Sequence, residues 1–197
     1  MSCEGSIAEP GVTSEKPAVI VLAAGRGRRF QASGGTLSKL DAPLLGVPVL
    51  QHVLNAVASS GLEWHVVRSA AGGGMGDSIA AGVRAMAGAC GWLILPGDLP
   101  LVTAHSVRLV AASLASHPVV VPHWLGRQGH PVGFRSECLN ALLQLSGESG
   151  AASIVRAHRG KGEVLDLALD DRGVVMDVDT LDDLADVESL MLSRGFP

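Results

Sequence analysis

PAVIVLAAGRGRRFQASGGTLSK, residues 17 to 39, carries the strongest fold signal in the chain. Its apolar run, Ala18 to Ala24, ends at the loop Gly25 to Arg29, and a lysine follows at Lys39. An unbroken run rich in β-branched residues, bounded by proline and glycine, predicts a strand buried on both faces of a parallel sheet. Because α/β sheets bind ligands at the loops after such strands, this loop is the first candidate binding site.

The loop residues indicate a phosphorylated ligand. Two glycines let backbone amides approach phosphate oxygens, and the surrounding side chains supply positive charge: Arg26, Arg28, Arg29 and Lys39. The dinucleotide pattern G-x-G-x-x-G is not met, because Phe30 stands at the third glycine position, and no Gly-Lys-Ser/Thr of a P-loop follows. A solvated basic turn after a core strand is the alternative for this loop taken alone.

The composition favours a single globular α/β domain. The chain has 197 residues, 47% of them hydrophobic, with 25 glycines and a net charge of -4. The net negative charge argues against nucleic acid as the main partner. No apolar stretch approaches the length of about 20 residues that is needed to cross a membrane. Three scattered cysteines without a C-x-x-C pair indicate a reducing cytoplasm. We expect a mobile lead-in over residues 1–16 and one domain over residues 17–197.

Strand and helix patterns alternate after the loop, which predicts a largely parallel sheet. Strands are expected at 64–67, 91–95, 117–122, 129–134, 163–169 and 172–178, and helices at 47–60, 77–88, 103–116, 136–145, from 147 and from 180. The last two strands are expected to form a hairpin around Asp170-Asp171. Thr103 is expected to cap one helix, and Thr180 with Asp183 to begin the final helix as a capping box.

Two aspartates are expected to join the basic loop at one edge of the sheet. Asp98 ends an apolar strand, and Asp179 follows the last expected strand. Two carboxylates beside a phosphate-binding loop predict a Mg²⁺-bound nucleoside triphosphate, because Mg²⁺ prefers oxygen ligands shared between carboxylate and phosphate. Taken singly, Asp98 could cap a turn and Asp179 could support a helix N-terminus.

His130 is the histidine with a candidate role in a site. It lies in Gly129-His130-Pro131, where the proline restricts the backbone before it and could hold the imidazole toward a substrate. The alternative, of equal weight, is a structural histidine whose hydrogen bonds are made within the core. The seven histidines form no H-x-x-x-H pattern for zinc, and no G-x-S-x-G elbow indicates a serine nucleophile.

Five short motifs in order, covering residues 18 to 187, resemble those of the MobA-like nucleotidyltransferases, nearest to the molybdenum cofactor cytidylyltransferases. They are VLAAGRGRRF (21–30) with Lys39-Leu40, GMGDS (74–78), LPGDLP (95–100), GRQGHP (126–131) and DVDTLD (177–182). The resemblance implies a Rossmann-like three-layer α/β fold with a mostly parallel (mixed) sheet. Compared with that family, the chain is one strand-helix unit shorter before the GMGDS motif.

The resemblance also implies a reaction: CMP moves from CTP to Mo-molybdopterin, with Mg²⁺, and pyrophosphate is released. A molybdenum hydroxylase would receive the finished cofactor. The Leu-Ala-Ala-Gly form of the first loop indicates the CTP-using branch rather than the GTP-using one. The implied roles are cytidine binding by Leu22, Ala23, Ala24 and Gly25; triphosphate binding by Arg26, Gly27, Arg28, Arg29 and Lys39; further nucleotide contacts by Gly76 and Ser78; metal binding by Asp98 and Asp179; and pterin binding by Gly129, His130 and Pro131.

Lys39, Asp98 and Arg29 are the expected catalytic side chains, and Lys39 is expected to be an exposed loop residue. Two alternatives remain open at this point. The same loop, lysine and aspartates would serve a nucleotidyltransferase for another phosphorylated acceptor, such as a sugar phosphate. A non-catalytic chaperone that binds molybdopterin is the alternative from another class, and the presence of both Lys39 and Asp98 speaks against it.

Overall fold

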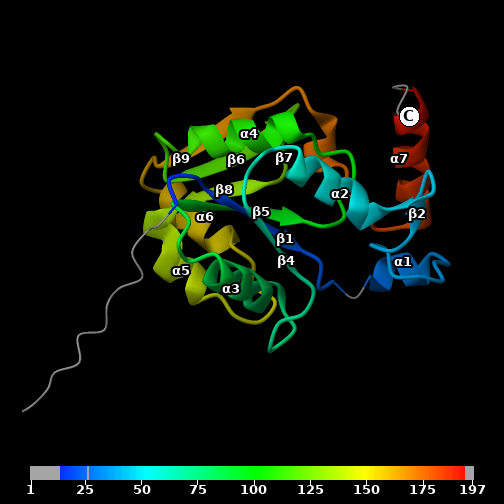
Figure 1. The fold of residues 1–197 in the computed structure, drawn as a ribbon, viewed down its shortest axis with the longest axis horizontal. Coiled ribbons are helices and arrows are strands. Elements are labelled where there is room, and N and C mark those ends of the chain that lie inside the picture. Colours follow the sequence, from blue (N-terminus) through cyan, green and yellow to red (C-terminus); the bar gives the residue numbers. More distant parts are fainter. Residues whose placement is uncertain (1–13, 26, 194–197) are drawn as a thin grey trace, which may run out of the picture.

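The computed structural model describes residues 14–25 and 27–193 (Figure 1). Seven strands form one mixed sheet: β1 (Ala18–Leu22), β4 (Trp64–Val67), β5 (Gly91–Pro96), β6 (Val119–Trp124), β7 (Arg127–Gln128), β8 (Val132–Arg135) and β9 (Val164–Ala168). Their order is β4-β1-β5-β8-β6, with β7 and β9 also paired to β6. Only β7 and β8 run antiparallel to their neighbours within these strands. The expected Rossmann-like, mostly parallel sheet is confirmed.

Helices cover both faces of this sheet, which gives three layers. The helices of the main body are α2 (Val49–Ala58), α3 (Met75–Ala85), α4 (Ala104–Ser113), α5 (Leu139–Leu143) and α6 (Ala152–Arg159). On β1, Val19 and Val21 belong to the hydrophobic cluster that contains residues of α2 and α4, whereas Ala18 and Ile20 belong to the cluster that contains residues of α3, α5 and α6. Successive strand residues point to opposite faces, so an unbroken apolar run is what a doubly covered strand requires.

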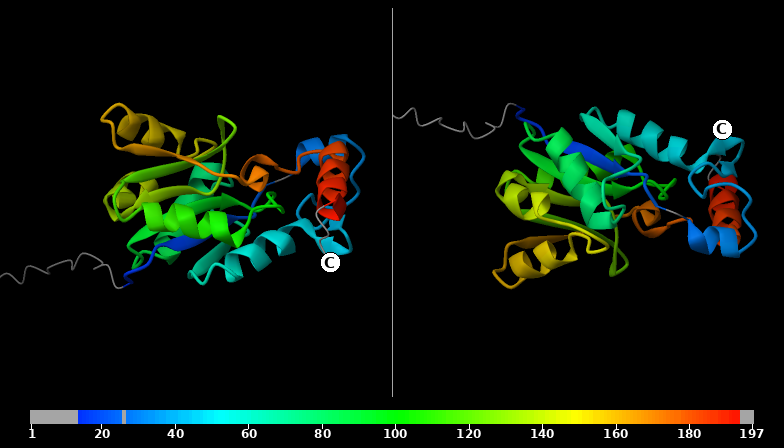
Figure 2. Two further views of the ribbon diagram at one scale, coloured as in Figure 1. Left: turned by 90° about the horizontal axis from the view of Figure 1, so that it is seen from above. Right: turned by 90° about the horizontal axis from the view of Figure 1, so that it is seen from below.

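A smaller unit stands at one end of the molecule and has its own hydrophobic cluster. It contains α1 (Arg28–Ala32), the short strands β2 (Pro43–Leu44) and β3 (Val47–Pro48), and α7 (Leu181–Ser193). In both views of Figure 2, α1 and α7 lie side by side there. Phe30 of α1 and Met191 of α7 are both buried in this cluster. The C-terminal helix therefore packs against α1, which carries Arg28 and Arg29.

The expected hairpin of strands at 163–169 and 172–178 is wrong. β9 pairs in parallel with β6, and the second expected strand is replaced by a 3₁₀ helix, Arg172–Val175. Asp171 is buried, and its carboxylate accepts hydrogen bonds from Gly173 N and from the residues that begin α4. These bonds turn the chain at Asp171, because a buried carboxylate needs its donors.

Two helices, α4 and α7, begin at the capping residues that the sequence predicts. Thr103 Oγ1 accepts a hydrogen bond from Ser106 N at the start of α4, as expected. Thr180 and Asp183 exchange the hydrogen bonds of a capping box before α7, which is also as expected. The helix expected from residue 147 begins at Ala152 instead, because residues 146–151 form a loop packed against α3.

The start of the described chain is held against the main body. Ser14 N donates to Gly88 O and Cys90 N donates to Lys16 O. Of the mobile lead-in expected over residues 1–16, residues 1–13 lie outside the described residues, and residues 14–16 carry these backbone bonds.

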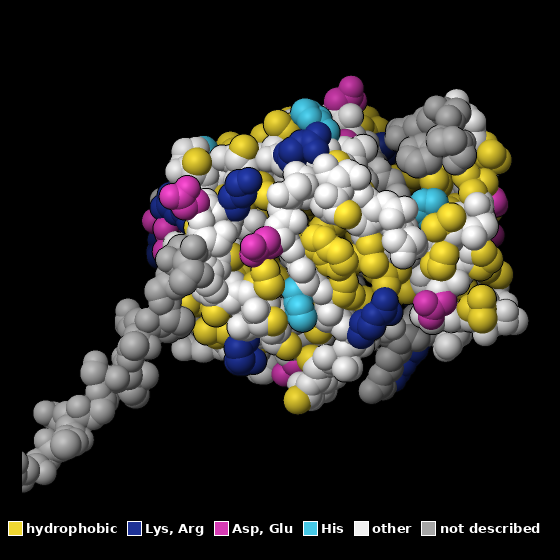
Figure 3. Space-filling view, viewed as in Figure 1, with side chains coloured by type: hydrophobic (Ala, Val, Ile, Leu, Met, Phe, Trp, Pro, Cys, Tyr) yellow, Lys and Arg dark blue, Asp and Glu magenta, His cyan; other side chains and the backbone are white. Residues whose placement is uncertain are grey.

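The surface in Figure 3 carries acidic and basic side chains interspersed. The described side chains form no large area of a single charge on that face. Among the helices in the described part of the chain, none is long and apolar enough to cross a membrane.

Candidate active site

A cavity of about 940 Å³ opens at the carboxyl ends of β1 and β5. This is the edge at which parallel strands present ligand-binding loops. Most of the expected site residues line it: Leu22, Ala24, Gly25, Gly27, Arg28, Arg29, Lys39, Ser78, Asp98, Gly129, His130 and Asp179. Segments from the two ends of the chain therefore meet in one cavity, whose volume is that of a small-molecule binding site.

Three expected site residues do not line the cavity. Ala23 packs against the core beneath the loop. Gly76 donates its N–H to Gly147 O, and a Cβ at this position would meet a neighbouring backbone, so it serves packing. Pro131 is buried where the chain enters β8. Arg26, also expected here, lies outside the described residues.

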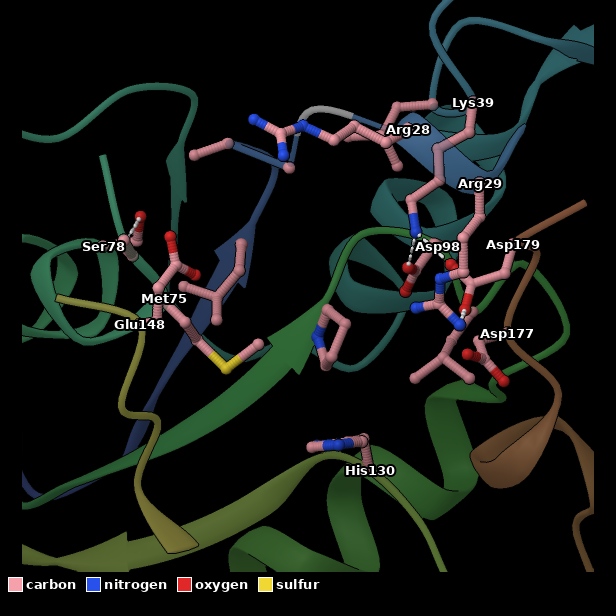
Figure 4. Close-up of a pocket in the computed structure, with 18 of the residues that line it drawn as sticks. Arg28, Arg29, Lys39, Met75, Ser78, Asp98, His130, Glu148, Asp177 and Asp179 are labelled. Carbon is pink, nitrogen blue, oxygen red and sulfur yellow. Dashed lines mark hydrogen bonds and ion pairs between the residues drawn. The ribbon is translucent and has the colours of Figure 1, made fainter. Parts of the chain in front are cut away.

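Lys39 is the centre of the charged end of the cavity. Its Nζ lies 2.5 Å from Asp98 Oδ2 and 2.8 Å from Asp179 Oδ1. Arg29 Nη1 approaches Asp179 Oδ2 at 2.6 Å. Only 12% of the Lys39 side chain is exposed, so the expectation of an exposed loop lysine is wrong. Two carboxylates 59 and 140 residues away along the chain draw the ammonium group inward (Figure 4).

Backbone contacts bring the two aspartates together. Asp98 follows β5, as the sequence indicates, but Asp179 follows an irregular segment rather than a strand. Val178 N donates to Asp98 O at 2.9 Å, which sets the segment before α7 beside the end of β5. Val178 is itself fully buried in the small hydrophobic cluster of α1 and α7. Gly27 adopts a left-handed backbone with φ 57°, a conformation that glycine adopts without strain, and a Cβ there would lie 3.5 Å from Lys39 Cγ.

The charges at this end shift one another's pKa values. Burial alone would lower the pKa of Lys39, but Asp98 and Asp179 outweigh it and raise that pKa above its ordinary value. Burial would raise the pKa of Asp179, but Lys39 and Arg29 hold it below its ordinary value. The pKa of neighbouring Asp177 is raised by partial burial and by the charges of Asp179 and Asp98. Lys39 and Asp179 therefore form a charged pair at neutral pH.

The donor set fits a divalent cation that shares ligands with a substrate. Asp98 Oδ1 is buried and has no hydrogen-bond partner among the described residues. No group of three or more His, Cys, Asp or Glu side chains in the described ranges is arranged to hold a metal unaided. Mg²⁺ needs only one or two carboxylates when phosphate oxygens and water complete its shell. The pair Asp98 and Asp179 meets that requirement.

The opposite end of the cavity lies at the N-terminus of α3. Ser78 is buried there, and its hydroxyl donates to Gly74 O at 3.0 Å. This hydroxyl hydrogen is therefore already engaged within the protein. Met75 stands beside it, half exposed toward the cavity. Figure 4 shows this end separated from Lys39, Asp98 and Asp179.

His130 lies on the wall of the cavity, below both of these ends in Figure 4. Its backbone N–H donates to Val174 O at 2.8 Å. Its ring nitrogen Nδ1 is buried without a hydrogen-bond partner in the described part of the chain. Burial lowers the pKa of His130, so the ring is neutral at pH 7 and offers one donor and one acceptor.

Thirteen further residues line the cavity without a role assigned from the sequence, and they include Met75, Arg127, Gln128, Glu148 and Asp177. Four of these five lie inside motifs that the sequence already marks, GMGDS, GRQGHP and DVDTLD, so position within a motif is a usable signal. Glu148 has no such signal, because it reaches the cavity only through the packing of residues 146–150 on α3.

The chain belongs to the MobA-like NTP transferase domain family, whose model matches residues 19–71 and 58–162. The resemblance to the MobA-like superfamily is thereby confirmed, and membership identifies the chain as a nucleotidyltransferase. Among curated proteins it is similar to the purine catabolism protein PucB of Bacillus subtilis (strain 168), with 29% identity over 194 residues. The matched region covers 82% of this chain and 90% of PucB.

Solved structures of two proteins show the shared fold. Rv0371c of Mycobacterium tuberculosis H37Rv has a TM-score of 0.73 at 24% identity, covering 90% of this chain and 99% of that one. The same protein is also known in complex with manganese, with a TM-score of 0.67 to this chain. Molybdopterin-guanine dinucleotide biosynthesis protein A of Archaeoglobus fulgidus has a TM-score of 0.63 at 16% identity, covering 89% and 99% of the two chains.

Proposed function

We propose that this protein transfers CMP from CTP to Mo-molybdopterin and releases pyrophosphate. The observation that carries the proposal is the position of Lys39 between Asp98 and Asp179, next to Arg29 of the basic loop. Cationic side chains beside two carboxylates suit a metal-bound triphosphate, and the Leu22-Ala-Ala-Gly25 loop supports CTP as that nucleotide. The reaction belongs in the cytoplasm, and a molybdenum hydroxylase is the recipient of the product.

The residues of the cavity act by alignment and charge neutralisation. Arg28, Arg29 and Lys39 would neutralise the triphosphate while a phosphate oxygen of the pterin attacks the α-phosphorus. The bond to pyrophosphate then breaks, and no covalent intermediate on the protein is required. Asp98 and Asp179 would hold a divalent cation such as Mg²⁺, which supplies further neutralisation of the phosphate charges. The manganese complex of Rv0371c supports divalent metal use.

A pyrophosphate-release assay tests the proposal. Each of the four ribonucleotides is supplied with Mg²⁺, with and without Mo-molybdopterin, and sugar phosphates replace the pterin in parallel reactions. Release only with CTP and the pterin together is the expected result. Release with a sugar phosphate would instead favour the other acceptor class, and tight pterin binding without any release would favour a non-catalytic chaperone.

We expect CTP to bind about tenfold more tightly than GTP. Ala24 lines the cavity, and its methyl group takes up space that a glycine would leave for a larger base. Calorimetric titration with both nucleotides measures the ratio. Ala24→Gly is the matched variant, and in it the ratio of CTP affinity to GTP affinity should be smaller than in the wild type. Equal affinities in the wild type would show that the loop does not select the base.

We expect His130→Ala to raise the KM for the pterin more than the KM for CTP. His130 lines the cavity beside Arg127 and Gln128, away from the β1 loop, and its unpartnered Nδ1 is available to a ligand. Steady-state kinetics with each substrate varied in turn separates the two effects. His105→Ala, an exposed histidine of α4, is the control. A selective loss of CTP affinity would assign His130 to the nucleotide.

A further inference from the structure

The loop of residues 146–150 is hydrogen-bonded to the N-terminal turn of α3 and packs closely against it. Asp77 Oδ2 accepts hydrogen bonds from Gly74 N and Gly147 N, both at 3.1 Å. Gly76 N donates to Gly147 O at 2.9 Å. A Cβ on Gly74 would collide with Gly147 O, and one on Gly76 would lie 2.6 Å from Ser149 O. The two backbones touch without room for side chains, so the place of this loop is fixed.

This contact sets Glu148 at the wall of the cavity. Glu148 lines the same cavity as Met75 and Ser78, and Figure 4 shows all three at the end away from Lys39 and Asp98. Within the part of the chain that the structure describes, the Glu148 carboxylate makes no hydrogen bond or ion pair, so it is free to meet a ligand.

The sign of the charge limits what that ligand group can be. Arg29 and Lys39 lie at the opposite end, so the triphosphate belongs there and the base reaches toward α3. A carboxylate repels phosphate and, when ionised, only accepts hydrogen bonds. Leu22 and Met75 supply apolar surface at this end, which suits the face of a flat ring. A carboxylate at this place therefore suits a neutral heterocycle edge that carries N–H donors.

We propose that Glu148 is a specificity residue that accepts a hydrogen bond from the exocyclic amino group of cytosine and thereby selects CTP over UTP. This rests on the proposed function. Cytosine presents an amino donor at the position where uracil presents a carbonyl acceptor, and carboxylates pair with that amino group in nucleic-acid recognition. Uracil would place its carbonyl oxygen against the Glu148 carboxylate. Both groups only accept hydrogen bonds, so neither would have a donor. The Leu22-Ala-Ala-Gly25 loop does not supply this distinction, because it separates bases by size.

Glu148→Gln tests the assignment. Glutamine keeps the shape but offers both a donor and an acceptor, so it tolerates either base. We expect the ratio of kcat/KM for CTP over UTP to fall about tenfold or more, with the pterin KM unchanged. The ratio of equilibrium affinities for CTP and UTP, measured by calorimetry without acceptor, should fall in parallel. Glu63→Gln, an exposed glutamate before β4, is the control and should leave both ratios unchanged.

The outcomes separate this inference from the proposed function. An unchanged CTP to UTP ratio in Glu148→Gln overturns the inference, even if the wild type transfers CMP to the pterin. A rise in the pterin KM alone also overturns it and assigns Glu148 to the acceptor. Failure of the wild type to use CTP with the pterin overturns the proposed function, and the calorimetric ratios of the wild type and the variant then decide the role of Glu148 independently.

Discussion

Asp98→Asn is expected to reduce turnover by about 100-fold or more, while nucleotide binding without metal persists or strengthens. Asparagine preserves the shape of the side chain but removes its charge. In the wild type, Asp98 Oδ2 holds Lys39 at 2.5 Å, and the buried Oδ1 has no partner among the described residues. A single substitution therefore weakens both the lysine contact and the proposed metal ligand. Pyrophosphate release measured over a range of Mg²⁺ concentrations gives the result.

Asp186→Asn is the matched control, because Asp186 lies exposed on α7 and does not line the cavity. It should leave turnover unchanged. Full Mg²⁺-dependent activity in Asp98→Asn would rule out the proposed metal site. Asp179→Asn should have the same direction of effect but be milder, because Asp177 lines the same cavity and can substitute.

Lys39→Met is expected to reduce turnover by about 100-fold and to lower the free energy of unfolding by about 2 to 4 kcal/mol. From the sequence alone we expect the fold to be unaffected. The structure changes that expectation, because Lys39 neutralises Asp98 and Asp179, whose side chains are only 15% and 14% exposed. Removing the ammonium group leaves the Asp98 carboxylate without a cationic partner, and Asp179 keeps only the exposed Arg29 guanidinium.

Metal binding provides a second measurement on Lys39→Met that does not depend on activity. Lys39 holds the same two carboxylates that a divalent cation would use, so the two cations compete in the free protein. Mn²⁺ should therefore raise the Tm of Lys39→Met more than that of the wild type. Lys161→Met, an exposed lysine far from the cavity, is the control. Equal shifts in all three proteins would show that the ion does not bind at these aspartates.

Local sequence patterns were sufficient for most of the fold. The apolar run of β1 predicts a strand covered on both faces, because burial on both faces requires apolar residues at every position. Thr103 and the Thr180-Asp183 pair mark helix starts for a similar reason, since a cap is a contact between residues three positions apart. The prediction of a second strand in the expected hairpin was wrong, because the turn at Asp171 depends on hydrogen-bond donors at the start of α4, which are distant in the chain.

The same distinction holds for the cavity. The sequence by itself determined that the chain is an α/β protein with a basic loop after β1, and that Lys39, Asp98 and Asp179 are the charged residues to consider. Only the tertiary structure decided that Lys39 lies between the two aspartates, because the hydrogen bond from Val178 N to Asp98 O and the packing of α7 on α1 bring them together. It alone also placed Glu148 on the cavity wall. Periodicity and caps report contacts between near neighbours, whereas a site depends on long-range packing that no single segment encodes.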